Sequence, residues 1–116
     1  LLKRGASVDL PTNLGITALM AAAYHGHPSI VLVLLQHSAN PDLQCSLGNT
    51  ALIDAAANGH EACVKTLLRA KANTELLDKD GDTALQHAEI AGHTAIAELL
   101  RQHAAPPPQA AAVVAA

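Results

Sequence analysis

Seven histidines, two cysteines and a run of closely spaced aspartates are the residues of this chain that could bind a metal ion or support catalysis. Three of the histidines, His27, His60 and His93, are 33 positions apart and fall on successive repeats of the chain. Neighbouring repeats lie roughly 10 Å apart, the width of a helix, whereas metal–ligand bonds are about 2 Å long. One ion cannot be shared over that distance, so we interpret these histidines as residues that cap a helix and bridge loops. The other four are expected on the surface: His25, His37, His87 and His103.

The acidic stretch at residues 78–82 has the carboxylate spacing of a calcium-binding loop, which Glu89 would complete. Such a loop requires glycine at its sixth position, where this chain has Thr83. No helix of the usual length precedes Asp78, and a motif without its structural context is weak. We therefore interpret the stretch as an acidic loop and predict no metal ion and no cofactor.

Cys45 and Cys63 are the candidate nucleophiles, but no nucleophile elbow, oxyanion loop or phosphate-binding glycine run accompanies them. Cys63 occupies the same repeat position as Ile30 and Ile96, which predicts a small hydrophobic residue of the core. Cys45 lies in a loop where its thiol is open to oxidation but has no activating neighbour. The sequence therefore predicts that the chain is not an enzyme.

The elements that position these residues form an internal repeat of 33 residues. Three copies align without a gap on Gly15, Gly48 and Gly81, and again on the Gly-His pairs at 26–27, 59–60 and 92–93. Nine of the 33 columns are identical in all three copies, which indicates one structural unit repeated. Neighbouring copies must stack, because one such unit is too small to bury its own apolar face.

Each copy predicts two short helices and an extended loop. Threonine caps the first helix and glycine ends it, giving helices over 18–24, 51–57 and 84–90. The second helix opens at Pro28 in the first copy and carries one apolar stripe, formed by Ile30, Val31, Leu34 and Leu35 and repeated as Cys63, Val64, Leu67 and Leu68. A polar segment of about a dozen residues then leads to the next copy. We call this segment the finger.

Composition sets further bounds on the fold and its partners. The 116 residues suit one domain, and the absence of Trp and Phe implies a thin core of Ala, Leu, Ile and Val. A net charge of −3 gives no basic surface for nucleic acid, and no apolar run is long enough for a membrane span. Two cysteines do not make a disulfide framework. We expect a monomer inside the cell, in the cytoplasm or the nucleus.

The combination of Gly-x-Thr-x-Leu, Ala-Ala-x-x-Gly-His and Val-x-x-Leu-Leu closely resembles the ankyrin repeat. The resemblance covers residues 1 to about 105 and implies an all-α solenoid of stacked antiparallel helix pairs with extended finger loops. We expect the tail of a preceding repeat at 1–11, full repeats at 12–44 and 45–77, a C-terminal capping repeat at 78–105, and a disordered tail rich in Ala and Pro at 106–116. On this interpretation the chain is the C-terminal part of a longer array.

Three departures from the family pattern have structural consequences. The usual Thr-Pro-Leu-His begins Thr-Ala-Leu in every copy, and the histidine that ordinarily ties neighbouring loops is lost. The glycine before the finger is Ser38 or Lys71, although Gly5 keeps it in the first segment. In the last copy Glu89 and Arg101 replace apolar residues, as expected of a repeat whose outer face meets water.

By resemblance to the family, a protein partner binds on the concave surface made by the finger tips and the first helices. The residues expected to bind it are those that differ between copies and point outward, with Tyr24 as the central anchor. The alternative is a purely structural cap of a larger repeat protein with no partner of its own. The expected binding residues are Asn13, Leu14, Ile16, Tyr24, His25, Ser46, Leu47, Asn49, Asn58, Lys79, Asp80 and Asp82.

Overall fold

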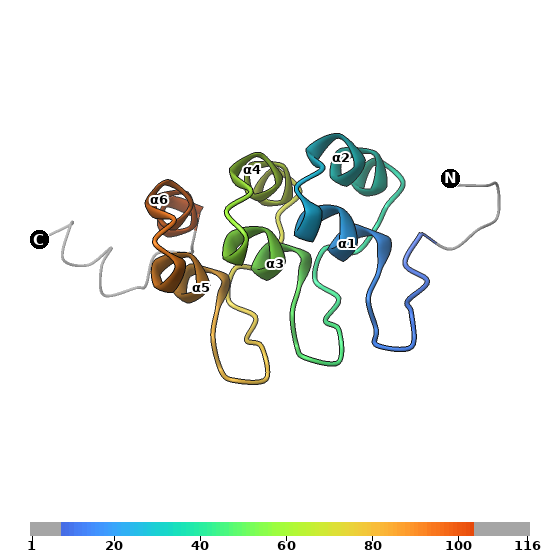
Figure 1. The fold of residues 1–116 in the computed structure, drawn as a ribbon. Coiled ribbons are helices and arrows are strands. Elements are labelled where there is room, and N and C mark those ends of the chain that lie inside the picture. The colour runs from blue at the N-terminus through green and yellow to red at the C-terminus, as the bar shows by residue number, and fades with distance from the viewer. Residues whose placement is uncertain (1–7, 104–116) are drawn as a thin grey trace, which may run out of the picture.

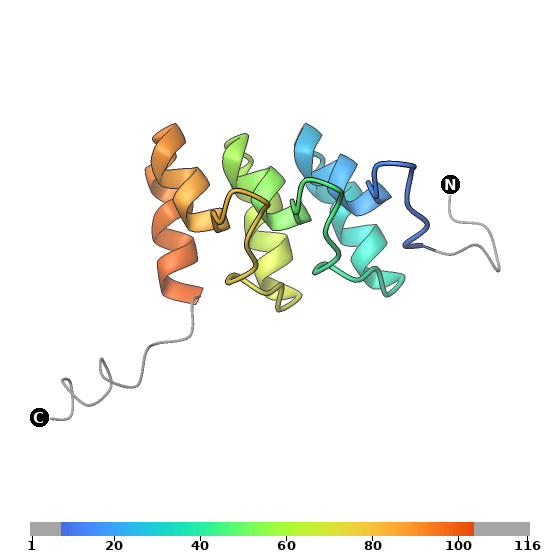
Figure 2. The ribbon, with the colours of Figure 1, turned by 90° about the horizontal axis from the view of Figure 1, so that it is seen from below.

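The computed structural model describes residues 8–103, which form six helices in three stacked pairs (Figure 1). The helices are α1 (Ala18–His25), α2 (Pro28–Gln36), α3 (Ala51–Ala57), α4 (Glu61–Arg69), α5 (Ala84–Ala91) and α6 (Thr94–His103). Helices α1, α3 and α5 form an inner layer and α2, α4 and α6 an outer layer. The fingers project from the inner layer (Figures 1 and 2). The predicted all-α solenoid of helix pairs is confirmed.

The first helices begin at the predicted threonine caps, and α1 and α5 end at the predicted glycines, whereas α3 ends at Asn58, one residue before Gly59. Thr17, Thr50 and Thr83 each accept a hydrogen bond from the backbone N–H three residues later, at 3.1–3.3 Å. Gly26 and Gly92 end α1 and α5 with φ angles of 76° and 79°. In this left-handed conformation the chain can turn directly into the second helix. The predicted bounds of these helices are correct to within one residue.

The apolar stripe of the second helices is buried in α4 but only partly in α2. Cys63 and its three stripe partners on α4 are all buried, and so are Val31 and Leu34 on α2. The prediction was wrong for Ile30, whose side chain is 42% exposed. Its counterparts Cys63 and Ile96 are buried against the preceding repeat, and among residues 8–103 no helix lies on that side of α2.

The histidines that recur in every repeat, His60 and His93, contact the preceding pair of helices. The Nε2 atom of His60 lies 2.9 Å from the carbonyl oxygen of Tyr24, at the end of the preceding first helix. The ring of His60 also packs against Gly26, where an added Cβ would lie only 2.6 Å from Nδ1. The ring of His93 packs on Gly59 in the same way, since an added Cβ there would lie 2.8 Å from Cε1 of the ring. The predicted bridging role is therefore confirmed for His60, but the predicted capping role was wrong for His27 and His60, whose side chains make no hydrogen bond to the start of their helices. The glycines have a second function in admitting the ring.

Backbone hydrogen bonds connect neighbouring fingers. The N–H of Ser46 donates to the carbonyl of Leu14 at 2.8 Å, and the N–H of Lys79 donates to that of Leu47 at 2.9 Å. At the base of the fingers, the Asp42 carboxylate accepts the N–H of Asn73 at 2.7 Å. These bonds hold the finger tips in a row even though the family's loop-bridging histidine is absent. None of the helices in residues 8–103 combines the length and the apolar character that a membrane span requires.

The C-terminal side of the described stack is charged, as predicted. Arg101 on α6 forms ion pairs of 2.7 Å with Glu89 on α5 and with Glu98 one turn earlier. All three side chains are about half exposed. The expected preceding-repeat segment with Gly5 and the expected tail at 106–116 lie wholly or largely outside the described residues.

Glycine at position 38 or 71 is expected to stabilise the fold by about 1 kcal/mol per site. Ser38 and Lys71 follow α2 and α4 with φ angles of 70° and 65°. This left-handed conformation is costly for a residue with a Cβ and free of strain for glycine. Urea unfolding of Ser38→Gly, Lys71→Gly and the double variant would measure the gain. A loss of stability in both single variants would contradict it.

Candidate functional site

The first two repeats form a cleft of about 410 Å³ between the inner helices and the finger tips. Finger residues before α1 and α3 line it together with residues of the two helices. Five of the predicted binding residues line it: Ile16, Tyr24, His25, Leu47 and Asn49. The structure thus brings together residues that are far apart in the sequence.

The apolar side chains around the cleft are available to a partner. Tyr24 is 52% exposed, and the edge of its ring meets the ring of His25 at a centroid distance of 5.1 Å. Leu47 is half exposed, and Ile16 is about one-third exposed. Between a third and a half of the surface of each side chain is therefore open to a partner.

The other predicted binding residues lie outside this cleft. Asn13, Leu14, Ser46, Lys79 and Asp80 are exposed on the finger tips. Asp82 is half-buried beside α5, and the amide of Asn58 donates to the backbone carbonyl of Asp54 at the end of α3. The predicted set thus forms a central cleft with a row of polar finger tips beside it.

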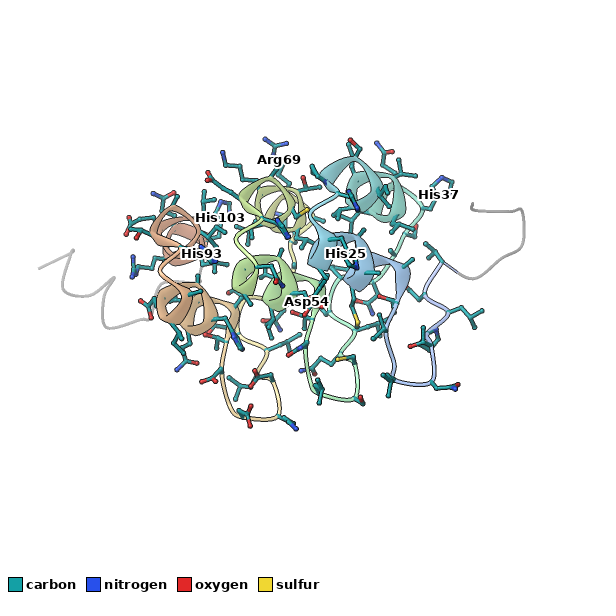
Figure 3. The ribbon with its side chains drawn as sticks, viewed as in Figure 1. His25, His37, Asp54, Arg69, His93 and His103 are labelled. Atoms are coloured by element: carbon teal, nitrogen blue, oxygen red, sulfur yellow. The ribbon has the colours of Figure 1, made fainter. Side chains whose placement is uncertain are left out.

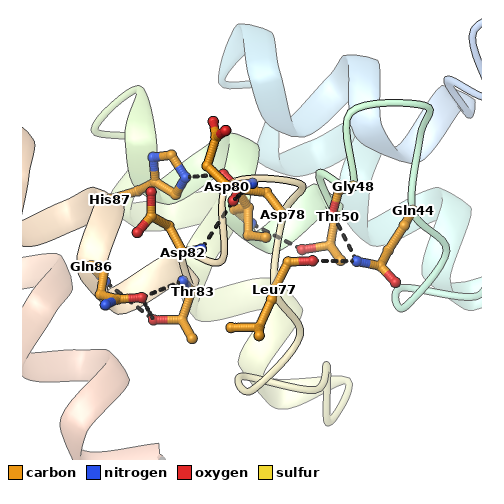
Figure 4. A network of polar contacts seen from close by, with 11 residues as sticks. Gln44, Gly48, Thr50, Leu77, Asp78, Asp80, Asp82, Thr83, Gln86 and His87 are labelled. Atoms are coloured by element: carbon orange, nitrogen blue, oxygen red, sulfur yellow. Dashed lines mark hydrogen bonds and ion pairs between the residues drawn. The ribbon is translucent and has the colours of Figure 1, made fainter.

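The third finger is braced by a hydrogen-bond network around Asp78 (Figure 4). One carboxylate oxygen of Asp78 accepts the backbone N–H groups of Asp80 and Asp82, each at 2.9 Å. The other oxygen lies 2.7 Å from Nε2 of His87 on α5. The hydrogen bond from Asp82, followed by that from His87, lowers the pKa of the Asp78 carboxyl. His87 is therefore not the plain surface residue predicted, because it is half-buried and fixes the finger to its helix.

The same residues come closest to a metal-binding arrangement in the described chain. Ligand atoms of Asp78, Asp82 and His87 lie within 4.8 Å of one another. Both oxygens of Asp78 already take part in hydrogen bonds within the finger, so the arrangement is explained by the loop itself. Glu89, the last position of the calcium-like spacing, is paired with Arg101 at 2.7 Å. These observations favour a structural network and give no support to a calcium loop.

Asp54, a residue that sequence analysis missed, lies on the cleft side of α3 (Figure 3). It is half-buried, and burial raises the pKa of its carboxyl to about 6, with His87 partly opposing the rise. Within residues 8–103 its carboxylate makes no hydrogen bond or ion pair. The equivalent positions hold Ala21 and His87, so comparing this column between copies would have marked it as variable. Met20, Ala21 and Cys45 complete the cleft.

Replacing Asp54 with asparagine is expected to raise the free energy of unfolding by about 1 kcal/mol at neutral pH, after discounting for partial exposure. A folded-state pKa raised above the ordinary value of about 3.9 favours the protonated carboxyl in the folded state. Stability conferred in this way is full at low pH and is lost as the pH rises through about 6. The advantage of Asp54→Asn should therefore be largest above pH 6 and fade toward about pH 4. Urea unfolding across this range, with the exposed Asp80→Asn as control, tests it. A gain independent of pH would contradict it.

A family model described as ankyrin repeats (3 copies) matches residues 1–77 and 38–111. No curated protein matches the chain. Ankyrin repeats are generally modules for protein–protein interaction. The repeat of 33 residues, the stacked helix pairs and the two overlapping matches agree, and the chain belongs to the ankyrin repeat family.

Proposed function

We propose that this chain binds a protein partner on its inner surface, with the cleft between the first two repeats as the centre of the site. The main support is that this cleft gathers half-exposed apolar side chains from two repeats around a few polar groups. Concave surfaces of this composition are typical of binding sites. Tyrosine is also enriched among residues that dominate interface energies.

The outer face of α2 is the competing surface. Leu32 and Val33 are each more than 40% exposed there, and Ile30 is 42% exposed on the side of α2 away from α4. Exposed apolar patches often mark interaction sites. We favour the inner surface because its cleft, at about 410 Å³, is larger than the groove of about 250 Å³ that Leu32 and Arg69 line on the outer layer. Its apolar walls also surround converging polar groups, whereas α2 itself contributes no charged side chain.

The module we propose acts as a monomer inside the cell, in the cytoplasm or the nucleus, without enzymatic activity and without a cofactor. Cys45 and Cys63 are both free thiols, which suits a reducing compartment. We propose 12–44 and 45–77 as full repeats and 78–105 as the cap. A purely structural cap is the alternative function.

Two equally exposed leucines allow a matched test of the proposed surface. Leu47 in the cleft is 49% exposed and Leu32 on the outer face of α2 is 48% exposed. The chain is immobilised, and proteins retained from a cell extract are compared between wild type, Leu47→Asp and Leu32→Asp. Because a charge in the cleft would be desolvated on binding, Leu47→Asp is expected to lose a specific partner that Leu32→Asp retains.

The other outcomes each decide against the proposal. Loss of the partner in Leu32→Asp alone would place binding on the outer layer. No partner retained by the wild type would favour the structural cap. Circular dichroism of both variants checks that each remains folded.

A further inference from the structure

We propose that the cleft receives a lysine or arginine side chain from a short segment of the protein partner, with its cationic group paired to Asp54. An apolar residue beside that cation would contact Tyr24 and Leu47. This inference rests on the proposed function and adds the chemistry of the segment that the inner surface recognises.

The shape of the cleft fits a side chain with an apolar stem and a charged end. Its walls are mostly apolar, and Met20, Tyr24 and Leu47 come from both repeats. Among the residues that line the cleft, Asp54 is the one with a carboxylate. Long basic side chains bury their methylene groups on apolar surface while their charged group reaches a polar partner.

The Asp54 carboxylate lacks a cation of its own in the described chain. A half-buried carboxylate without hydrogen bonds is costly unless a partner compensates it. Within residues 8–103, His87 of the neighbouring helix α5 opposes the rise in the pKa of this carboxyl only in part. A basic side chain entering the cleft would supply the missing partner as a charge-assisted hydrogen bond.

Charge is also distributed unequally between the two layers. The inner helices and the finger tips, residues 12–17, 45–50 and 78–83, hold a single Lys or Arg, which is Lys79. The other Lys and Arg residues of the described chain lie on or just after α4 and on α6, in the outer layer. Figure 3 shows Arg69 on the outer side of α4, away from Asp54. Asp54, Asp80 and Asp82 are the acidic residues of this face in the described chain that have no cationic partner, because Asp78 is bonded to His87 and Glu89 is paired with Arg101 on the C-terminal side of the stack. A basic segment would therefore be attracted to this face.

The middle repeat departs from its neighbours where it lines the cleft. In the first and third fingers, Thr12 and Asp78 accept backbone N–H groups of their own finger tips. The equivalent Cys45 has no oxygen to accept such bonds and instead forms part of the apolar wall. On α3, the carboxylate of Asp54 stands where the first repeat has Ala21. Both changes make the cleft more suitable for an apolar stem with a cationic end.

A selection from a random dodecapeptide library displayed on phage, carried out on the full chain, tests the inference. Asp54→Asn removes the carboxylate with little change in shape. Glu61→Gln removes one negative charge from the outer helix α4, where Glu61 is paired with Lys65 at 3.3 Å, and controls for net charge. Peptides selected by the wild type and by Glu61→Gln are expected to be enriched in Lys or Arg next to an apolar residue. Asp54→Asn should lose this enrichment.

Binding of one selected peptide can then be compared with its analogue in which citrulline replaces arginine, or norleucine replaces lysine. We expect about tenfold weaker binding of the neutral analogue to the wild type and no difference between the two on Asp54→Asn. Amide shifts in NMR spectra should change around α1, α3 and their fingers.

Neutral or acidic selected peptides, a basic enrichment that survives Asp54→Asn, or no selected peptide at all would each overturn the inference. The comparison of Leu47→Asp with Leu32→Asp is independent of these results. If partner binding depended on Leu47 but not on Asp54, the proposed function would stand. Only the pairing of a basic side chain with Asp54 would be refuted.

Discussion

Gly26→Ala is expected to lower the free energy of unfolding by about 3 kcal/mol, whereas Gly92→Ala should cost about 1 kcal/mol. Both glycines end a first helix in the left-handed conformation, with φ angles of 76° and 79°. Their surroundings differ. A Cβ on Gly26 would lie 2.6 Å from Nδ1 of His60, while nothing lies within 4 Å of one on Gly92. The strain of the left-handed conformation is common to both, so the difference between the variants measures the contact between repeats.

The larger loss at Gly26 arises because His60 has no simple way to move. Its Nε2 atom is held 2.9 Å from the carbonyl oxygen of Tyr24. Displacing the ring would break this hydrogen bond and weaken the packing between the second repeat and the first. Stability of a short repeat array resides largely in such contacts between neighbours.

Urea unfolding followed by circular dichroism gives both values, and a double-mutant cycle isolates the ring. In a His60→Ala background the cost of Gly26→Ala should fall to about that of Gly92→Ala. Equal losses at Gly26 and Gly92 in the wild-type background would show that the conformation of the glycine is the whole effect.

Features that depend on one repeat alone could be predicted from the sequence. The threonine caps and the glycine ends follow from local hydrogen bonding, and they place the first helices to within one residue.

Features that depend on a neighbour could not be predicted in the same way. The same column is buried at Cys63 and exposed at Ile30, because exposure depends on whether another helix pair lies beside it. His87 was expected on the surface, but the folding of the third finger brings Asp78 to its ring. Internal comparison identifies the scaffold from identical columns. Such a comparison does not predict the surroundings of a residue in a variable column, such as Asp54, because residues of two repeats form those surroundings.

Tyr24→Ala is expected to weaken the complex with the protein partner by about 2 kcal/mol, or roughly 30-fold in Kd. The ring of Tyr24 lies at the rim of the cleft and is 52% exposed in the free chain. A partner that covers it would bury a large apolar surface at little cost in side-chain entropy. Removing the ring should change the free energy of unfolding by less than about 0.5 kcal/mol, because it is not part of the core. The hydrogen bond from His60 is to the backbone of Tyr24 and is kept in the variant.

Ile90 provides the control, since it occupies the position of Tyr24 on α5 and is 78% exposed. Ile90→Ala removes an exposed apolar group from the same layer but outside the cleft, so it should leave Kd nearly unchanged. Calorimetric titration with the captured partner and thermal unfolding of each variant separate binding from stability. If Tyr24→Ala lowered both by similar amounts, the ring would belong to the core. If Ile90→Ala weakened binding equally, the interface would extend along the whole inner layer, and the cleft would no longer be its centre.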